Sequence, residues 1–342
     1  MILRRTSFPF LILSIVLTGC LPSSCNRVEP RDISSADSTS RAMAASMPVD
    51  TLEIRFAREY DRNDFRSPRT IMMDEAGRLF VSDTQTHTIH RISTDGDIDA
   101  SVKLAESIPY LAGQRGDTTW VFAPLEGRVY TLVDLVQRDS VDLDLGAGDE
   151  RSMRWVLKTD SGFVSKVLDD SDGNRIAFHN GAGAIEHRVE LSAASWRYAG
   201  FLRERGDHVL SLSGFLPYVF PISEKKVDSL RLTGFDSPML ARTLQFERGT
   251  TDQPPLLSGS AAVAGDWLFV LNMRPGWLHI DVFNRNGELA YVLTEPDPAF
   301  NKEYYPTDIS ARALTDGSFE IAVTITEPAP GVQSYSWKMP RQ

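Results

Sequence analysis

Apolar and polar residues alternate along one stretch in the first third of the chain, AGRLFVSDTQTHTIHRISTDGDI, from Ala76 to Ile98. Such alternation places successive side chains on opposite faces of a β-strand. The pair Asp95-Gly96, which follows two alternating runs, is typical of a tight hairpin turn. Together with an apolar run before it and an alternating run after it, the stretch predicts four short antiparallel strands within about 35 residues.

The same pattern recurs along the chain. Each copy carries a glycine near the start of its second strand, and successive glycines are 39 to 59 residues apart. These glycines are Gly77, Gly116, Gly162, Gly206, Gly265 and Gly317. Groups of four short strands repeated every ~40–50 residues are the sequence signature of propeller blades. The six copies therefore predict six blades.

The sixth copy is one strand short, whereas the alternating segment from Thr51 to Arg58 belongs to no copy. If this segment completes the sixth blade, the ring closes and the exposed edges of an open array disappear. We therefore predict an all-β fold over residues 49–342, a six-bladed β-propeller of four-stranded antiparallel blades, closed by the N-terminal strand. A β-sandwich and a pair of smaller β-domains are the alternatives.

One copy carries a recognisable motif. From Pro68 to Gly96 the chain reads Pro-x-x-Ile, then Asp-x-x-Gly-x-Leu-Phe-Val-Ser-Asp, then Ile-x-x-Ile-x-x-x-Gly. This blade resembles an NHL-type repeat, and the chain as a whole resembles the six-bladed β-propeller lipoproteins of bacteria. The resemblance implies an extracytoplasmic propeller, and it leaves the activity open because such propellers include hydrolases, lactonases, lyases and binding modules.

Residues 1–19 have the features of a signal peptide. The basic start MILRR precedes an apolar run of ten residues, which is too short to span a bilayer as a helix. The run ends in Leu17-Thr18-Gly19-Cys20, which resembles a bacterial lipobox and implies lipidation of Cys20. Residue 21 is leucine, not the aspartate that retains such lipoproteins at the inner membrane, so we expect the outer membrane for a Gram-negative source. An ordinary secretory signal with a chance cysteine is the alternative.

Residues 20–48 are rich in Ser, Ala, Arg and Asp and show no apolar period, which predicts a flexible, lipidated tether. The tether carries Cys25, the second of two cysteines, so the domain itself has no disulfide.

The net charge of −10 changes the list of partners. Duplex nucleic acid requires a dense cationic face, so we predict no nucleic-acid binding. The expected partners are the membrane, through the lipid anchor, and either an envelope protein or a small anionic ligand.

Metal and cofactor motifs do not emerge from the sequence. The six histidines form neither His-x-His nor His-Glu-x-x-His. The run from Asp169 to Asn174 would need a carboxylate at position 168 to match a calcium loop, and Leu168 stands there, so we interpret it as a hairpin turn. We predict no metal and no cofactor, and we cannot nominate a catalytic residue.

Five residues are candidate ligand-binding residues near the mouth of the axial channel. Arg69 and Arg154 occupy equivalent positions eight residues before their repeat glycines, and Arg197 lies nine before its own. Tyr305 and Asp308 lie at the start of the sixth copy. Three guanidinium groups there could bind a carboxylate, a phosphate or an acidic sugar. Alternatively, each arginine pairs with one of the many carboxylates of the chain.

The sequence thus favours a lipid-anchored envelope propeller that binds a ligand or a protein. The alternative is a propeller enzyme of lactonase or lyase type, acting on a small anionic or sugar-derived substrate at the axial channel. A structural subunit of an envelope complex is a third interpretation.

Overall fold

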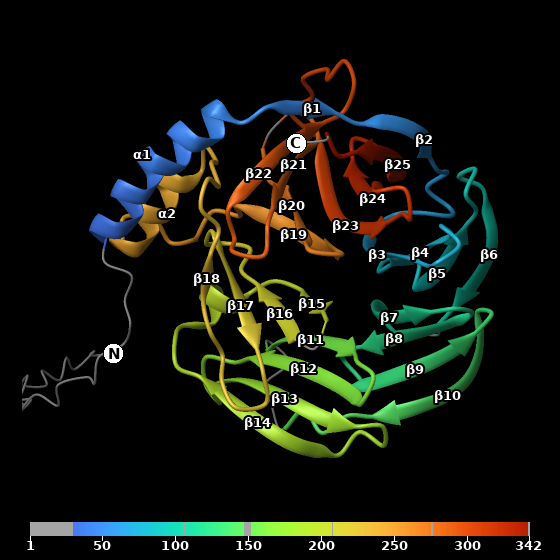
Figure 1. Cartoon of the computed structure of the whole chain (residues 1–342). Coiled ribbons are helices and arrows are strands. Elements are labelled where there is room, and N and C mark those ends of the chain that lie inside the picture. Colours follow the sequence, from blue (N-terminus) through green and yellow to red (C-terminus); the bar gives the residue numbers. More distant parts are fainter. Residues whose placement is uncertain (1–29, 105–106, 147–151, 207, 275, 341–342) are drawn as a thin grey trace, which may run out of the picture.

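Six sheets surround a common axis in the computed structural model (Figure 1). The structure describes residues 30–104, 107–146, 152–206, 208–274 and 276–340. The first strand of each sheet contacts the first strands of its two neighbours, so these six strands lie nearest the axis. The prediction of a six-bladed β-propeller is confirmed.

Each blade is an antiparallel sheet whose strands follow one another from the axis outward. The first three blades consist of β3 (Pro68–Met73), β4 (Leu79–Asp83), β5 (Thr88–Ile92) and β6 (Ile98–Lys103); β7 (Tyr110–Arg115), β8 (Thr118–Ala123), β9 (Arg128–Val133) and β10 (Val136–Asp142); and β11 (Met153–Lys158), β12 (Gly162–Leu168), β13 (Asn174–Asn180) and β14 (Ile185–Leu191).

The other three blades follow the same order. They consist of β15 (Leu202–Arg205), β16 (His208–Leu212), β17 (Tyr218–Ile222) and β18 (Leu230–Arg231); β19 (Ser258–Ala264), β20 (Trp267–Asn272), β21 (His279–Phe283) and β22 (Leu289–Thr294); and β23 (Tyr305–Ala313), β24 (Ser318–Glu327), β25 (Gly331–Lys338) and β2 (Glu53–Glu59).

The second strand of a blade is buried most deeply, and the outermost strand least. Strand β4 is buried along its whole length, whereas the outermost strands β6 and β10 expose many of their residues. The core lies between neighbouring blades, because both faces of a second strand are covered. Between blades 5 and 6, for example, the Phe319 ring lies 5.3 Å from that of Phe269 and 5.5 Å from that of Trp337, centroid to centroid.

The N-terminal segment closes the ring, as predicted. Strand β2 pairs antiparallel with β25, and Ile54 lies opposite Tyr335. The turn glycine Gly96 has a φ of +88°, and a Cβ atom there would lie 2.8 Å from the Phe56 ring of β2, so only glycine fits. A further strand, β1 (Val49–Thr51), adds to the outer edge of blade 5 in parallel with β22, which the sequence did not indicate.

The predicted flexible tether over residues 20–48 is wrong in its second half. Residues Pro30–Ser46 form helix α1, which contacts helix α2 (Leu240–Glu247) on the outside of the ring (Figure 1). Most of a helix's stability comes from packing of one face rather than from propensity, so a weak sequence pattern does not exclude a helix.

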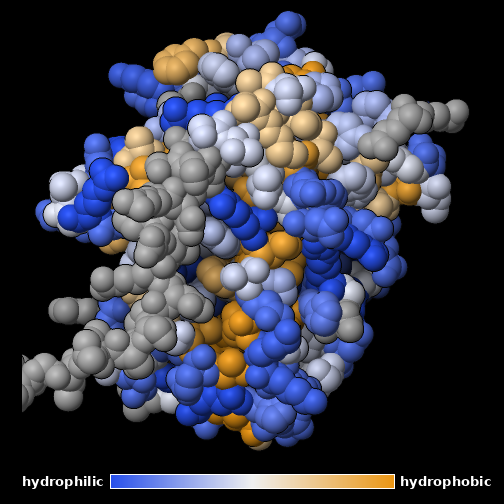
Figure 2. Space-filling model, turned by 60° about the vertical axis from the view of Figure 1, so that its left-hand side comes forward, coloured by the Kyte–Doolittle hydropathy of each residue, from blue (hydrophilic) through white to orange (hydrophobic). Residues whose placement is uncertain are grey.

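The packing of α1 is specific. Met43 and Met47 lie against the apolar cluster between blades 4 and 5, and the buried Ser40 hydroxyl accepts a hydrogen bond from Gly234 N–H at 3.3 Å. Figure 2 shows the side of the molecule on which α1, α2 and β18 lie, where apolar surface forms a narrow band between polar side chains.

Blade 4 differs from its prediction. The sequence pattern places its innermost strand at residues 198–202, but Ser195–Tyr198 is a 3-10 helix and β15 begins at Leu202. Tyr198 lies outside the strand and belongs to the apolar cluster between blades 3 and 4.

Two predictions lie outside the described residues, namely the signal peptide over residues 1–19 and lipidation of Cys20. Within the part of the chain that the structure describes, neither helix is long and apolar enough to cross a membrane.

Candidate functional site

The innermost strands face the axis with one edge that has no neighbouring strand. Backbone N–H groups on this buried edge need acceptors from elsewhere. Ile71 N–H donates to the Oδ2 atom of Asp308 at 2.9 Å, and Leu111 N–H donates to the Thr70 hydroxyl at 2.9 Å. Side chains from one blade therefore satisfy the backbone of the next and connect the blades around the axis.

An ion pair between Arg203 of β15 and Asp308 of β23 lies at the centre of this arrangement. The Arg203 Nη2 atom is 2.6 Å from Asp308 Oδ1, and the two side chains are 14% and 1% exposed. Arg203 also donates to the Ala261 carbonyl at 2.7 Å and to the Ser260 hydroxyl at 2.9 Å.

The Asp308 carboxylate is fully engaged. Besides Arg203 and Ile71, it accepts hydrogen bonds from the Ser260 hydroxyl and from Ile309 N–H, the latter at 2.9 Å. Through these contacts the pair, which we call the axial ion pair, joins blades 1, 4, 5 and 6.

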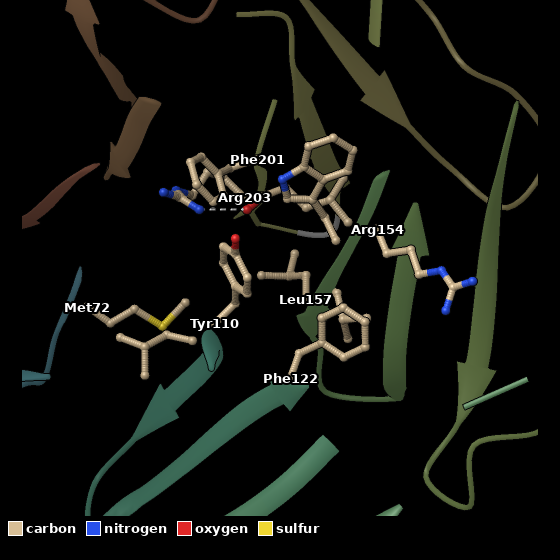
Figure 3. Close-up of a pocket in the computed structure, with 11 residues that line it drawn as sticks. Met72, Tyr110, Phe122, Arg154, Leu157, Phe201 and Arg203 are labelled. Carbon is tan, nitrogen blue, oxygen red and sulfur yellow. Dashed lines mark hydrogen bonds between the residues drawn. The ribbon is translucent and has the colours of Figure 1, made fainter. Parts of the chain in front are cut away.

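A pocket opens beside the axial ion pair, on the side of blades 2, 3 and 4 (Figure 3). The space that can hold the centre of a water molecule amounts to about 10 Å³, so the pocket is narrow in this structure and a larger ligand requires its wall side chains to move. Apolar and aromatic side chains from blades 1 to 4 form most of its wall, with two arginines. The residues of this axial pocket are Met72, Tyr110, Leu111, Phe122, Arg154, Trp155, Val156, Leu157, Phe201, Leu202 and Arg203.

Directly behind the pocket wall lies a buried lysine. Lys166 of β12 is opposite Trp155 of β11 in the sheet, and its ammonium is 4.5 Å from the centroid of the Trp155 ring. Its Nζ atom donates to the carbonyls of Tyr198, at 2.7 Å, and of Gly200, and to the Ser211 hydroxyl at 2.9 Å. Burial, and secondarily the charge of Arg203, holds the pKa of Lys166 well below its ordinary value.

The predicted site residues do not gather in one place. Arg154 lines the axial pocket, but its guanidinium points away from the centre and donates to the Pro124 carbonyl at 3.2 Å (Figure 3). Asp308 lies at the axis in the axial ion pair. Arg203 connects these two positions, because it belongs to both the pocket wall and the ion pair.

The other three lie elsewhere. Arg197 pairs with Glu247 of α2 at 3.0 Å and lies over the Trp196 ring. Burial raises the pKa of Glu247, and Arg197 partly offsets that rise. Arg69 lies half-buried at an irregularity in the pairing of β3 with β4, and Tyr305 is 40% exposed at the start of β23. A ligand-binding role for the five stays a prediction.

Sequence reasoning missed Arg203, Lys166 and Tyr110. Arg203 was missed because the innermost strand of blade 4 was placed too early in the chain. Lys166 could have been found from the sequence, because it places a cation in the middle of the apolar run FVSKVL, which is buried on both faces of its sheet.

The acidic run from Asp169 to Asn174 is the hairpin turn that we expected. Asp169 Oδ1 accepts hydrogen bonds from the N–H groups of Ser171, at 2.8 Å, and Asp172, at 3.0 Å, which is the geometry of a local turn. Over the described residues, no three histidine, cysteine or carboxylate side chains lie close enough together to hold a metal ion.

Comparison with known proteins gives likeness in fold alone. No protein-family model and no curated protein matches the sequence. Among solved structures, a luciferin-regenerating enzyme is similar at 11% identity over 84% of this chain and 95% of its own, with a TM-score of 0.53. A Bacteroides fragilis protein described as exported has 10% identity over 84% and 96%, with a TM-score of 0.52.

A third similar structure is a catalytically inactive variant of virginiamycin B lyase from Staphylococcus aureus with quinupristin. It is 13% identical over 82% of this chain and 87% of its own, with a TM-score of 0.50. At such identities the likeness shows that this chain shares the propeller fold with enzymes and with an exported protein, and its function has to be argued from its own residues.

Proposed function

We propose that this chain is an exported, lipid-anchored propeller of the bacterial envelope that binds a small ligand in the axial pocket. The observation that carries the proposal is the pocket wall. The innermost strands of four successive blades place Met72, Tyr110, Trp155 and Arg203 around one opening. Concave sites lined by aromatic side chains with a few polar groups are the usual form of small-molecule sites.

The axial ion pair supports binding rather than catalysis at the centre of the ring. A catalytic carboxylate needs an oxygen that can exchange a proton with the substrate. Both oxygens of Asp308 accept hydrogen bonds from within the protein, so this group holds blades together. The lyases among the similar structures leave an enzyme as the alternative, because their fold hosts both kinds of protein.

The proposed anchor rests on the sequence from Leu17 to Cys20 and on the likeness to a protein described as exported. We expect Cys20→Ala to move the protein from the membrane fraction to the soluble fraction, whereas Cys25→Ala leaves it with the membranes. Mass spectrometry of the N-terminal peptide of the membrane form should show a lipidated Cys20. Equal fractionation of the two variants would contradict the anchor.

The ligand site is tested by filling it. Benzoate is a suitable first probe, because it carries one charge on one small aromatic ring. We expect NMR titration to show saturable binding to the full chain and loss of that binding in Tyr110→Trp. Tyr218→Trp, on β17 and outside the pocket, is the matched control and should bind as the parent does. Absence of binding, or binding that survives Tyr110→Trp unchanged, would contradict the proposed site.

The enzyme alternative has its own test. Propeller lactonases hold calcium on the axis, so metal content and the melting temperature in calcium and in EDTA should reveal such a centre. Stoichiometric calcium whose removal lowers the melting temperature would favour the enzyme.

A further inference from the structure

Lys166 is enclosed completely, with a relative exposure of 0%. All three of its hydrogen-bond acceptors are neutral: two backbone carbonyls, of Tyr198 and Gly200, and the hydroxyl of Ser211. Three acceptors match the three N–H groups of an ammonium. The geometry therefore holds the nitrogen firmly without supplying a negative charge.

The absence of a counter-charge is unusual for a buried lysine. Buried charges in proteins are normally paired, because removal of an ion from water costs several kcal/mol. Among the described residues, no carboxylate lies within ion-pair distance of Lys166, and the charged side chain that bears on it is another cation, Arg203. Arg203 has its own partner in Asp308, so a proton on Lys166 adds a positive charge that no carboxylate among the described residues balances.

Lys166 does not line the axial pocket but lies behind Trp155, which does. The Trp155 ring forms part of the pocket wall, and Lys166 lies one strand further from the axis, with its ammonium against that ring. Two polar groups on the pocket wall also favour an anionic ligand. The Tyr110 hydroxyl and the Trp155 N–H have no hydrogen-bond partner among the described residues, and both can donate.

We propose that Lys166 is the charge that selects an anionic ligand in the axial pocket, and that this ligand is a small carboxylate with an apolar or aromatic body. The inference rests on the proposed function and names the ligand class of that same site. The carboxylate supplies the missing counter-charge, while the aromatic wall covers the apolar body. Lys166 acts through the field across Trp155, in a protein interior where screening by water is weak.

Binding of an anion then has a consequence for the proton on Lys166. Burial and Arg203 lower the pKa of the free protein's Lys166, and a bound carboxylate raises it again. The groups that face its nitrogen come from four places: Trp155 on β11, Arg203 on β15, Ser211 on β16, and the carbonyls of Tyr198 and Gly200. Among these groups, Arg203 carries a charge. Because a bound carboxylate raises the pKa of Lys166, ligand binding is coupled to proton uptake by Lys166.

The test uses three probes of one shape and different charge: benzoate, benzamide and benzamidinium. We expect the full chain to bind benzoate roughly tenfold more tightly than benzamide, and benzamidinium least. In Lys166→Gln, which keeps two donors but removes the charge, we expect benzoate and benzamide to bind alike. Lys225→Gln removes an equal charge from the exposed turn between β17 and β18 and should leave the preference intact.

The pH profile separates an electrostatic role from a structural one. In the parent protein, the affinity for benzoate should fall as rising pH removes the proton from Lys166, at a pH below the ordinary pKa of a lysine, and the affinity for benzamide should not change. In Lys166→Gln the fall should disappear. Lys166→Met gives the same comparison if the glutamine variant does not fold.

The other outcomes separate the two claims, that the pocket binds a ligand and that Lys166 makes it prefer an anion. Equal binding of all three probes to the parent protein would overturn the anion inference and leave the pocket as a ligand site. A preference for benzoate that persists in both Lys166 variants would assign the selectivity to Arg154 and Arg203 instead. Failure of every probe to bind would overturn the proposed function itself.

Discussion

The two sides of the ring centre bury positive charge in different ways. On the side of blades 5, 6 and 1, Arg203 meets Asp308, and neighbouring groups complete the hydrogen bonds of both. On the side of blades 3 and 4, Lys166 is buried more completely than Arg203, yet it meets only neutral oxygens and the face of an indole ring.

The difference indicates a division of labour. A charge pair with all its hydrogen bonds made is rigid, because any movement leaves a buried charge uncompensated. A single buried cation is balanced only when something else supplies the anion. The paired side therefore fits the role of a hub that joins blades, and the unpaired side fits the role of a site that accepts a ligand.

The largest expected effect comes from breaking the pair. Asp308→Leu leaves Arg203 buried without its carboxylate, and we expect a loss of roughly 3–5 kcal/mol in the free energy of unfolding, measured by urea denaturation. The double variant Arg203→Met with Asp308→Leu should recover part of that loss, because it removes both charges. A single variant within about 1 kcal/mol of the parent would show that the axial ion pair does not hold the blades together.

A smaller effect is expected from removal of the unpaired cation. Lys166→Met leaves two carbonyls without a donor, which costs about 1–3 kcal/mol each, but it also abolishes the burial of a charge. We expect the two effects to offset each other to within about 2 kcal/mol in the same urea assay. If Lys166→Met lost as much free energy of unfolding as Asp308→Leu, Lys166 would be as important for stability as the axial ion pair, and the proposed difference between the two sides would be contradicted.

The same contrast has a pH signature. The pKa of Lys166 is lower in the folded protein than its ordinary value of 10.5, so the unfolded chain binds more protons in the interval between these two values. Stability contributed by this residue therefore rises with pH across that interval and declines as the pH falls through it. We expect the difference in melting temperature between the parent and Lys166→Met to shift in favour of the parent as the pH rises toward 10.5. A constant difference would contradict the depressed pKa.

The smallest effect on stability is expected at the pocket wall. Tyr110 is half-buried, and its hydroxyl has no partner among the described residues, so Tyr110→Phe should change the free energy of unfolding by less than about 0.5 kcal/mol. Binding of benzoate should weaken several-fold, because a donor in the pocket is lost. Trp120, on the neighbouring strand β8, provides a Trp120→Phe control outside the pocket.

The fold was predictable because it depends on local repetition. Alternation, turn glycines and a regular period occur in every copy, so an error in one blade does not change the count. The spare strand at residues 51–58 and the incomplete sixth copy together indicated the closure. Helix α1 could not be predicted in the same way, since its stability depends on Met43 and Met47 packing against a cluster that only the folded ring creates.

The site was less predictable because it depends on which blades face one another. Asp308 was named because it lies at the start of an innermost strand, and the structure places it at the axis. Arg197 was named for its position nine residues before its repeat glycine, but the structure places Arg203 at the axis and Arg197 against Glu247. A repeat pattern sets the number of blades well and the register of one irregular strand poorly.

The closure of the ring also dictates an order of events during synthesis. Strand β2 leaves the ribosome among the first structured segments, but its partner β25 is nearly the last, as the pairing of Ile54 with Tyr335 shows. Contacts between such distant segments form slowly, because a long loop must close before they contribute stability. Ile54 and Phe56 therefore have no strand to pair with until β25 has been made, and β2 cannot cover the first blade from its place in the sixth blade before then.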